Sequence, residues 1–444
     1  MSLAGRGRKM HAPLSTGHDR QDYLAGKRQA WLAFALAFLL MAFDFIDRQV
    51  VVAMFPYLKV EWAVSDKELG ALVAAVSVTI ALASLPIALL SDRWGRIKAI
   101  VVMGALWSLA TITCGLARSY SELLAARSLI GLGEAGYGPA AGALLASLFP
   151  SRLRATVIGG FLAAAAVGSV AGVVLGGAIS GHWGWRAAFG VVGIPGLILA
   201  LLFLRVRDYR TVASGVREAA APVSLRAVAA ELFRARSGVA AYLAGALQLM
   251  TVSTVYAWLP SYLNRAYGLS GEGAGLEAAI VIAVGSIGAV LWSAAADRLG
   301  RRDPRYKLFV PAAGGVATLL LLSSAFAVLP PGAAQFAMIM LGGFTMTATT
   351  GAIPAIAIDV VHAGLRATAG SMVTVVQNLF GLGLGPLITG ALSDAFGLDI
   401  ALAVVPVSCL LSAGVLLLGS RSYLQDLRNV HVGWAPDVAA AQTA

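Results

Sequence analysis

Apolar stretches of about 20 residues recur along this chain, and they restrict its fold more than any other feature of the sequence. A helix needs about 20 apolar residues to cross the hydrocarbon core of a bilayer. Of the 444 residues, 59% are hydrophobic and only 12% are charged. A water-soluble protein of this length carries about twice that share of charged residues. We therefore expect an all-α, polytopic membrane protein.

Twelve such stretches predict twelve transmembrane helices. Their approximate bounds are 31–54, 69–90, 99–117, 122–148, 156–181, 186–205, 239–264, 274–295, 308–329, 334–359, 367–392 and 399–420. The basic stretch 206–238 divides them into two six-helix halves, 31–205 and 239–420. Residues 1–30 are polar and basic and lack the apolar core of a signal peptide. We expect them to form a disordered tail. A second tail covers 421–444.

The distribution of Lys and Arg predicts the orientation in the membrane. The tails and alternate loops on one side carry 26 of these residues. The other side carries only five: Lys59, Lys67, Arg118, Arg186 and Arg265. Because cytoplasmic loops hold the excess of basic residues, both termini are expected in the cytoplasm, in the plasma (inner) membrane. This pattern accounts for the net charge of +11, so we expect no nucleic-acid partner.

The basic stretch 206–238 contains a possible surface helix. Within "VSLRAVAAELFRARSG", residues Leu225, Val228, Leu232 and Phe233 recur at helical spacing, with arginines elsewhere. Such a pattern is typical of an amphipathic helix on the inner leaflet. A solvated linker is the alternative interpretation.

The two halves repeat three short motifs in the same order. The pairs are "SDRWGR" (91–96) with "ADRLGRR" (296–302), "LRAT" (153–156) with "LRAT" (365–368), and "GGAISGHWG" (176–184) with "TGALSDAFG" (389–397). Duplicated six-helix halves are typical of transporters, whose substrate site lies near the membrane midplane between the halves. Secondary transport is therefore the leading function class.

These loops, the twelve spans and the duplication resemble the major facilitator superfamily. More narrowly, "FIDRQVVVAMFPYLKVEW" and "LIGLGEAGYGPAAGALLASLFPSRLRAT" resemble its Spinster-like branch and the related anion:cation symporter family. The family's loop motif usually begins with Gly, whereas Ala88 and Ser293 stand at those positions here. The resemblance implies a monomeric secondary transporter that works by alternating access, without a cofactor and without enzymatic activity.

The first predicted helix carries three ionisable residues in "MAFDFIDRQVV" (41–51). Asp44, Asp47 and Arg48 stand at i, i+3 and i+4, so they share one side of the helix. Each would cost roughly 2.5–3.5 kcal/mol at the centre of a bilayer, and such residues therefore face protein or water and mark a functional site. The alternative is that Asp44 and Arg48 form a purely structural pair.

The fourth predicted helix carries a matching set, Arg127 and Glu134, in "ARSLIGLGEAGYGPAAG". Arg127 and Glu134 are seven residues apart and lie on one face. The family resemblance implies that Asp47 and Glu134 bind coupling protons and that Arg48 binds an anionic substrate. Arg127 would steady Glu134 or the cytoplasmic half of the pathway and is a further substrate-binding candidate. Asp44 and Tyr137 are additional candidates.

A physical argument supports proton coupling at this site. Burial favours the protonated form of a carboxyl group, whereas an adjacent arginine favours the charged form. We therefore expect Asp47 and Arg48 to exchange partners. Protonation would free Arg48 to bind a substrate carboxylate or phosphate.

The second half offers uncharged candidates. Tyr256, Gln377 and Asn378 are expected to line the cavity and to bond the neutral part of a substrate. The alternative is that such side chains bond only to their own helix. The repeated loops offer a gating motif whose charges hold one transport state, namely Asp92, Arg93, Arg96, Asp297 and Arg298.

Other function classes find little support. "GLGEAG" (131–136) matches a dinucleotide-binding pattern but lies within an apolar helix with no preceding strand, so we reject it. Cys114 and Cys409 lie in apolar runs, and we expect no metal site. The expected partners are protons, membrane lipids and an anionic small molecule, either an organic acid or a lysophospholipid-like amphiphile. An uncoupled facilitative carrier and a Spinster-type lipid exporter are the alternatives.

Overall fold

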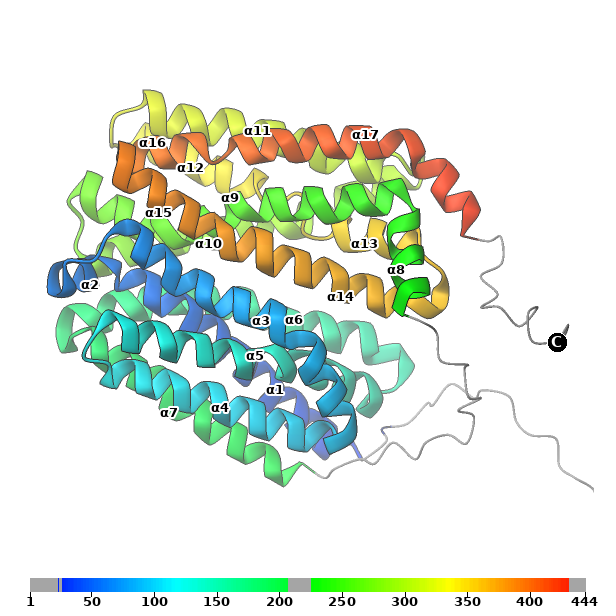
Figure 1. The fold of residues 1–444 in the computed structure, drawn as a ribbon, viewed down its shortest axis with the longest axis horizontal. Coiled ribbons are helices and arrows are strands. Elements are labelled where there is room, and N and C mark those ends of the chain that lie inside the picture. Colours follow the sequence, from blue (N-terminus) through cyan, green and yellow to red (C-terminus); the bar gives the residue numbers. More distant parts are fainter. Residues whose placement is uncertain (1–22, 24–25, 207–224, 431–444) are drawn as a thin grey trace, which may run out of the picture.

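The structure, a computed structural model, describes residues 23, 26–206 and 225–430. These residues form helices joined by short connections, and no strand occurs among them (Figure 1). Ten spans are long and apolar enough to cross a membrane on their own. The fourth span and the interrupted tenth complete the twelve spans expected from the sequence.

The first half follows the predicted bounds closely. Its spans are α1 (Lys27–Ala53), α3 (Asp66–Trp94), α4 (Arg96–Leu116), α5 (Tyr120–Leu148), α6 (Ser151–Trp183) and α7 (Trp185–Leu202). A short helix, α2 (Phe55–Trp62), lies between α1 and α3, and a single 3-10 turn, Phe203–Arg205, ends the half. The surface helix expected in the basic stretch corresponds to α8 (Leu225–Arg234).

The second half departs from the predicted pattern because three of its spans are interrupted. The uninterrupted spans are α9 (Arg236–Tyr267), α10 (Gly271–Gly300) and α11 (Tyr306–Val328). The tenth span consists of α12 (Ala333–Thr345) and α13 (Ala352–Asp359). The eleventh joins α14 (Arg366–Val376), a π-helix (Gln377–Gly383) and α15 (Leu384–Phe396), after a 3-10 turn at Ala363–Leu365. The twelfth joins α16 (Leu398–Val404) and α17 (Val407–Asn429), with Pro406 between them.

Glycine at three sharp turns lets one span lead directly into the next. Gly95, Gly184 and Gly397 have φ angles of +91°, +79° and +93°. Only glycine adopts such angles readily. Two of these residues end the paired motifs at 176–184 and 389–397, so the sequence repeat encodes the same turn in both halves.

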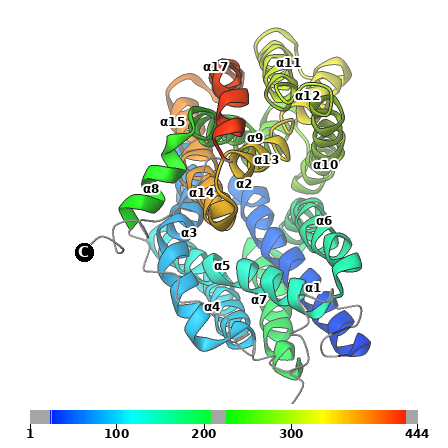
Figure 2. The ribbon, with the colours of Figure 1, turned by 90° about the vertical axis from the view of Figure 1, so that its right-hand side faces the viewer.

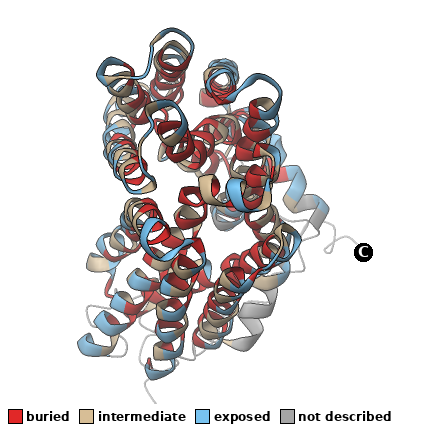
Figure 3. Ribbon diagram, turned by 90° about the vertical axis from the view of Figure 1, so that its left-hand side faces the viewer, coloured by how far each residue is buried: buried red, intermediate tan, exposed pale blue. Residues whose placement is uncertain are grey.

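The two halves lie side by side, and both described termini are at one end of the molecule (Figures 1 and 2). We call the opposite end, which carries α2, the closed end; Figure 3 views it directly. The side chain of Asp66, at the start of α3, joins the halves there. Its oxygens accept hydrogen bonds from Arg265 at 2.7 and 2.8 Å, from Lys59 at 2.5 Å and from Ser393 at 2.5 Å. Asp394 in turn accepts the first two N–H groups of α3 at 2.8 and 2.9 Å.

We use the name closed-end latch for the residues of these bonds, namely Lys59, Asp66, Arg265, Ser393 and Asp394. Close backbone contacts reinforce it. A Cβ atom added to Gly70 of α3 would lie 2.3 Å from the carbonyl oxygen of Pro386 in α15. One added to Gly177 of α6 would lie 2.3 Å from the carbonyl oxygen of Gly271 in α10. The halves therefore touch backbone to backbone at this end.

The gating motif lies at the end that carries the termini. Nη1 of Arg96 donates a 3.0 Å hydrogen bond to the carbonyl oxygen of Ala143, which ties α4 to α5 within the first half. Asp297 and Arg298 are exposed in the last turn of α10. The side chains of Asp92 and Arg93 lie outside the described residues. The gating role stays a prediction.

Candidate functional site

Five ionisable side chains meet between α1 and α5 inside the first half. Asp44, Asp47 and Arg48 come from α1, whereas Arg127 and Glu134 come from α5. All except Arg48 are at most 5% exposed. The structure thus brings together the two sets of charges that the sequence placed on the first and fourth spans. We call these five residues the charged cluster.

One ion pair of the cluster is fully buried. Nη1 of Arg127 lies 2.8 Å from Oδ2 of Asp47, and its Nε donates to the carbonyl oxygen of Leu72 in α3 at 3.4 Å. The other oxygen of Asp47 is buried and has no hydrogen-bond partner in the described part of the chain. Arg127 therefore contacts Asp47 and not Glu134, contrary to one of the two roles expected for it.

The second arginine bridges two carboxylates. Nη2 of Arg48 forms an ion pair with Oε2 of Glu134 at 2.5 Å, and its Nε donates to Oδ1 of Asp44 at 3.2 Å. The guanidinium also lies over the ring of Phe45, 5.1 Å from its centre. The Asp44–Arg48 pair that the sequence allowed is present. Arg48 is not paired with Asp47, whose Oδ2 lies against Arg127 instead.

Tyr137 completes the coordination of Asp44. Its hydroxyl donates a 2.7 Å hydrogen bond to Oδ2 of Asp44 and lies 3.1 Å from the sulfur of Met41. The side chain is 1% exposed. Both oxygens of Asp44 are thus occupied, one by Tyr137 and the other by Arg48.

The charges of the cluster do not balance. Three carboxylates face two guanidinium groups, so the cluster carries one net negative charge when all five groups are ionised. A buried, uncompensated charge costs several kcal/mol. One bound proton would make the cluster neutral. Arg48, with 22% of its side chain exposed, is the most exposed member of the cluster.

The three uncharged candidates lie in the second half. Tyr256 is half-buried in α9, and its hydroxyl lies against Gly285 of α10. Nδ2 of Asn378 donates to the carbonyl oxygen of Thr374 at 2.9 Å, which is the bond to its own helix that the sequence allowed as the alternative. Gln377 begins the π-helix, and its Nε2 lies against Gly245 of α9. π-helical turns occur frequently at functional sites.

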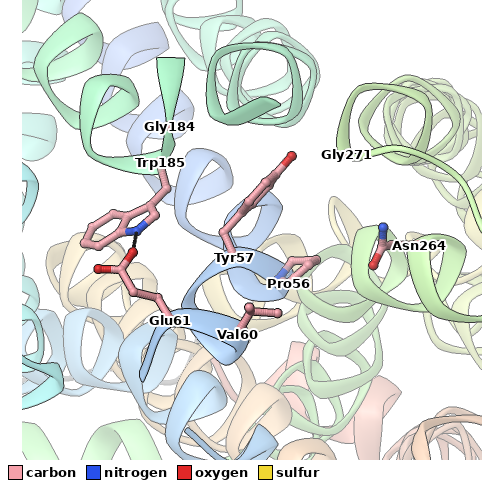
Figure 4. Close-up of a pocket in the computed structure, with 8 residues that line it drawn as sticks. All are labelled: Pro56, Tyr57, Val60, Glu61, Gly184, Trp185, Asn264 and Gly271. Carbon is pink, nitrogen blue, oxygen red and sulfur yellow. Dashed lines mark hydrogen bonds between the residues drawn. The ribbon is translucent and has the colours of Figure 1, made fainter. Parts of the chain in front are cut away.

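A separate cavity of about 570 Å³ lies between the halves at the closed end (Figure 4). Its lining is Pro56, Tyr57, Val60, Glu61, Gly184, Trp185, Asn264 and Gly271. The indole N–H of Trp185 donates to Oε2 of Glu61 at 2.6 Å, and Nη1 of Arg186 lies 2.8 Å from its Oε1. Both contacts lower the pKa of the Glu61 carboxyl group. The cavity shares no residue with the charged cluster, and none of its lining residues was a site candidate from the sequence.

Comparisons with known proteins agree with this architecture. The family model described as Major Facilitator Superfamily matches residues 37–382. An "MFS-type efflux pump" of Mycolicibacterium smegmatis is 29% identical over 93% of this chain and 95% of its own length. A "Gallate transporter" of Pseudomonas putida is 28% identical over 93% of this chain and 97% of its own.

The fold has a solved counterpart. A crystal structure of a bacterial homologue of the human lysosomal transporter Spinster, inward-facing and unoccupied, superposes with a TM-score of 0.82. That protein is 23% identical, and the match covers 93% of this chain and 100% of that one. The family match, the twelve spans and the duplicated halves lead to one conclusion: the chain belongs to the Major Facilitator Superfamily of membrane transporters.

Proposed function

We propose that this protein is a proton-coupled transporter of organic anions, with both termini in the cytoplasm and the spans in the inner membrane. The observation that carries the proposal is the charged cluster, in which three buried carboxylates share two arginines. Such a cluster alternates between a charged and a neutral state by binding one proton. Buried carboxylates that share a site do not all ionise together.

Glu134 is the proton acceptor that controls Arg48. While Glu134 is ionised, it forms an ion pair with Arg48 at 2.5 Å. Arg48 is the one arginine of the cluster whose side chain is partly exposed. Protonation of Glu134 removes that charge and leaves Arg48 with Asp44 alone. Arg48 is then free to form a bidentate, charge-assisted pair with a substrate carboxylate. Binding of the anion restores the negative partner that protonation removed, so proton and substrate favour each other.

Asp47 is the second proton acceptor in this proposal. Its unpartnered oxygen is buried, whereas the other oxygen holds Arg127. Protonation there would loosen the contact between α1 and α5. The coupling of proton binding to the movement of the halves would use this pair, because Arg127 also bonds the backbone of α3.

The printed names of the relatives support an organic substrate. One similar protein carries gallate, a carboxylate with three hydroxyl groups, and another is an efflux pump. An anionic carboxylate suits the exposed face of Arg48.

The test uses the purified protein in liposomes with a pH-sensitive dye trapped inside. Gallate, galactonate and lysophosphatidylglycerol are added outside to wild type, Arg48→Gln and Arg118→Gln. We expect internal acidification with a carboxylate, its loss in Arg48→Gln, and wild-type behaviour in Arg118→Gln, which changes an exposed arginine just before α5. Anion uptake without acidification would refute the coupling and support a facilitative carrier. Acidification driven only by the lysolipid would replace the proposed substrate class.

A further inference from the structure

The cavity at the closed end is formed by both halves of the transporter. α2, Gly184 and Trp185 come from the first half, whereas Asn264 of α9 and Gly271 of α10 come from the second. Figure 4 shows Trp185 on one side, Asn264 and Gly271 on the other, and the side chains of α2 between them. Its volume of about 570 Å³ lies within the range of about 300–1,000 Å³ that small-molecule sites occupy. The cavity therefore has the size of a ligand site.

The aromatic wall of the cavity is fixed in its orientation. The indole N–H of Trp185 donates to Oε2 of Glu61 at 2.6 Å. The ring of Trp185 meets that of Trp62 edge to face, with centres 5.2 Å apart. The guanidinium of Arg186 lies 4.2 Å from the centre of the Trp185 ring. Because the indole is held on several sides, this wall is preorganised for an aromatic ligand.

The charge at the cavity is already matched. Among the described residues that line it, Glu61 is the one that carries a charge. Its Oε1 lies 2.8 Å from Nη1 of Arg186, and its Oε2 is bonded to Trp185. An ionic ligand would have to compete with the pair of Glu61 and Arg186, whereas an uncharged ligand leaves it intact. The lining thus favours an uncharged compound over an organic anion.

Two side chains of the lining have hydrogen-bonding atoms left for a ligand. The Tyr57 hydroxyl lies against Gly271, across the boundary between the halves, and makes no hydrogen bond to the described part of the chain. Nδ2 of Asn264 donates to the carbonyl oxygen of Leu269 at 2.8 Å, which leaves its Oδ1 as an acceptor. A phenol can use either group, because its hydroxyl both accepts and donates hydrogen bonds.

The cavity has two walls only while the halves touch at this end. Arg265 of α9 reaches across the halves to Asp66 in the latch, and its neighbour Asn264 lines the cavity. α2 forms the opposite wall, and the ring of its Phe55 packs on that of Trp258 in α9, with centres 5.2 Å apart. Separation of the halves pulls these walls apart. A ligand that touches both walls therefore binds the closed form and stabilises it.

We propose that the closed-end cavity binds an uncharged aromatic alcohol, such as 2-naphthol, against Trp185 and hydrogen-bonded to Tyr57. The bound compound joins the two halves and opposes the opening that transport requires. This site is separate from the charged cluster. The inference does not depend on the proposed function, because its test measures binding in the absence of any transported substrate.

The experiment measures the alkylation of an introduced cysteine by a charged maleimide in lipid nanodiscs, with 2-naphthol as the probe. Asn264→Cys places the thiol in a half-buried wall of the cavity, whereas Phe396→Cys lies outside it at the same end. The natural cysteines, Cys114 and Cys409, are buried. At ten times its Kd, 2-naphthol should slow alkylation of Asn264→Cys about tenfold and leave that of Phe396→Cys unchanged. Val60→Cys, on the α2 wall, serves as a second reporter and should give the same midpoint.

Variants in the Asn264→Cys background test the contacts. Tyr57→Phe should raise the concentration for half protection about three- to tenfold, because it removes one hydrogen bond. The matched control is Tyr120→Phe, which removes a hydroxyl that donates to the carbonyl oxygen of Glu68 at 3.0 Å at the same end and should leave that concentration unchanged. Asp66→Asn should raise it, because less of the protein is then in the closed form.

Four results would count against the proposal. Absence of protection at both cavity reporters, or equal protection of Phe396→Cys, would overturn the site. A midpoint in Tyr57→Phe equal to that of the control would overturn the assigned hydrogen bond. A midpoint unchanged in Asp66→Asn would overturn the preference for the closed form. 2-Naphthoate, which has the same rings and a negative charge, should protect more weakly than 2-naphthol, and stronger protection would overturn the class of ligand.

Discussion

The closed-end latch makes a quantitative prediction about the balance between transport states. In Asp66→Asn, the carboxylate that accepts two hydrogen bonds from Arg265 and one from Ser393 across the halves is replaced by a neutral amide. Hydrogen bonds to charged groups contribute about 1.5–3 kcal/mol each. Because the amide oxygen keeps some of these contacts and Arg265 is partly exposed, we expect the closed state to lose about 2–3 kcal/mol. That corresponds to a change of about 30- to 150-fold in the equilibrium between closed and open forms.

The assay is a distance measurement across the closed end. Spin labels on Val60→Cys in α2 and Phe396→Cys in α15 report the separation of the halves, since these positions are 86% and 63% exposed. The natural cysteines, Cys114 and Cys409, are buried and should label poorly. We expect one short distance in the parent protein and an added longer distance in Asp66→Asn.

A neighbouring residue provides the matched control. Glu68 lies two residues further along α3, and its carboxylate accepts the N–H of Ser65 at 2.8 Å within the first half. Glu68→Gln should therefore leave the distance distribution unchanged. An unchanged distribution in Asp66→Asn, or the same change in both variants, would refute the assignment of Asp66 as a latch between the halves.

Three further predictions concern packing, the buried ion pair and pH. Gly70→Ala places a Cβ 2.3 Å from a backbone carbonyl oxygen of α15, so we expect it to open the closed end in the spin-label assay. The control is Gly142→Ala, whose added Cβ meets no atom within 4 Å and which should leave the closed end unchanged. Arg127→Met alone leaves the Asp47 carboxylate buried and unpaired, which should lower the free energy of unfolding by about 3–5 kcal/mol. The thermal midpoint in detergent should therefore fall. The double variant Arg127→Met with Asp47→Leu should recover much of that loss. Because the pKa of Glu61 is lowered in the folded state, its contribution to stability is present above its usual pKa and is lost as the pH falls through the folded value. Its exposed pair contributes less than about 1 kcal/mol, so the wild-type midpoint should fall slightly more than that of Glu61→Gln on acidification below pH about 4.5.

The positions of the spans were predictable because the length of an apolar helix is fixed by the bilayer. The predicted first and fourth spans, 31–54 and 122–148, match α1 and α5 within a few residues. The break at 346–351 was missed although "MTATTG" contains three threonines and a glycine, which are weak helix formers. The prediction of a continuous helix over 334–359 rested on hydropathy. The side chains that donate hydrogen bonds to the broken segment, such as Gln248, come from another span, so the local sequence does not reveal them.

The members of the charged cluster were predictable, but their pairing was not. Helical spacing places Arg127 and Glu134 on one face of the fourth span. Which carboxylate each arginine meets depends on how α1 is rotated and shifted against α5, and that is decided by tertiary packing. Arg127 lies opposite Asp47, whereas Arg48 reaches Glu134.

The partners of the closed-end latch could not be predicted from the sequence either. "SDKE" (65–68) carries a capping box, and the mutual bonds of Ser65 and Glu68 are present at 2.8 and 3.2 Å. That pattern predicts where a helix begins. It does not reveal that Asp66, between these two residues, meets Arg265, which is 199 positions away in the chain.

The central claim is that the charged cluster couples protons to substrate. The most direct test compares two modes of transport in liposomes for Glu134→Gln, Asp47→Asn and the control Glu122→Gln, an exposed acid at the start of α5. One mode is exchange of labelled for unlabelled substrate at equal pH, and the other is accumulation driven by a pH gradient. We expect Glu134→Gln and Asp47→Asn to keep exchange and to lose accumulation, with the control behaving as wild type. Gradient-driven accumulation at the wild-type level in both cluster variants would contradict the account.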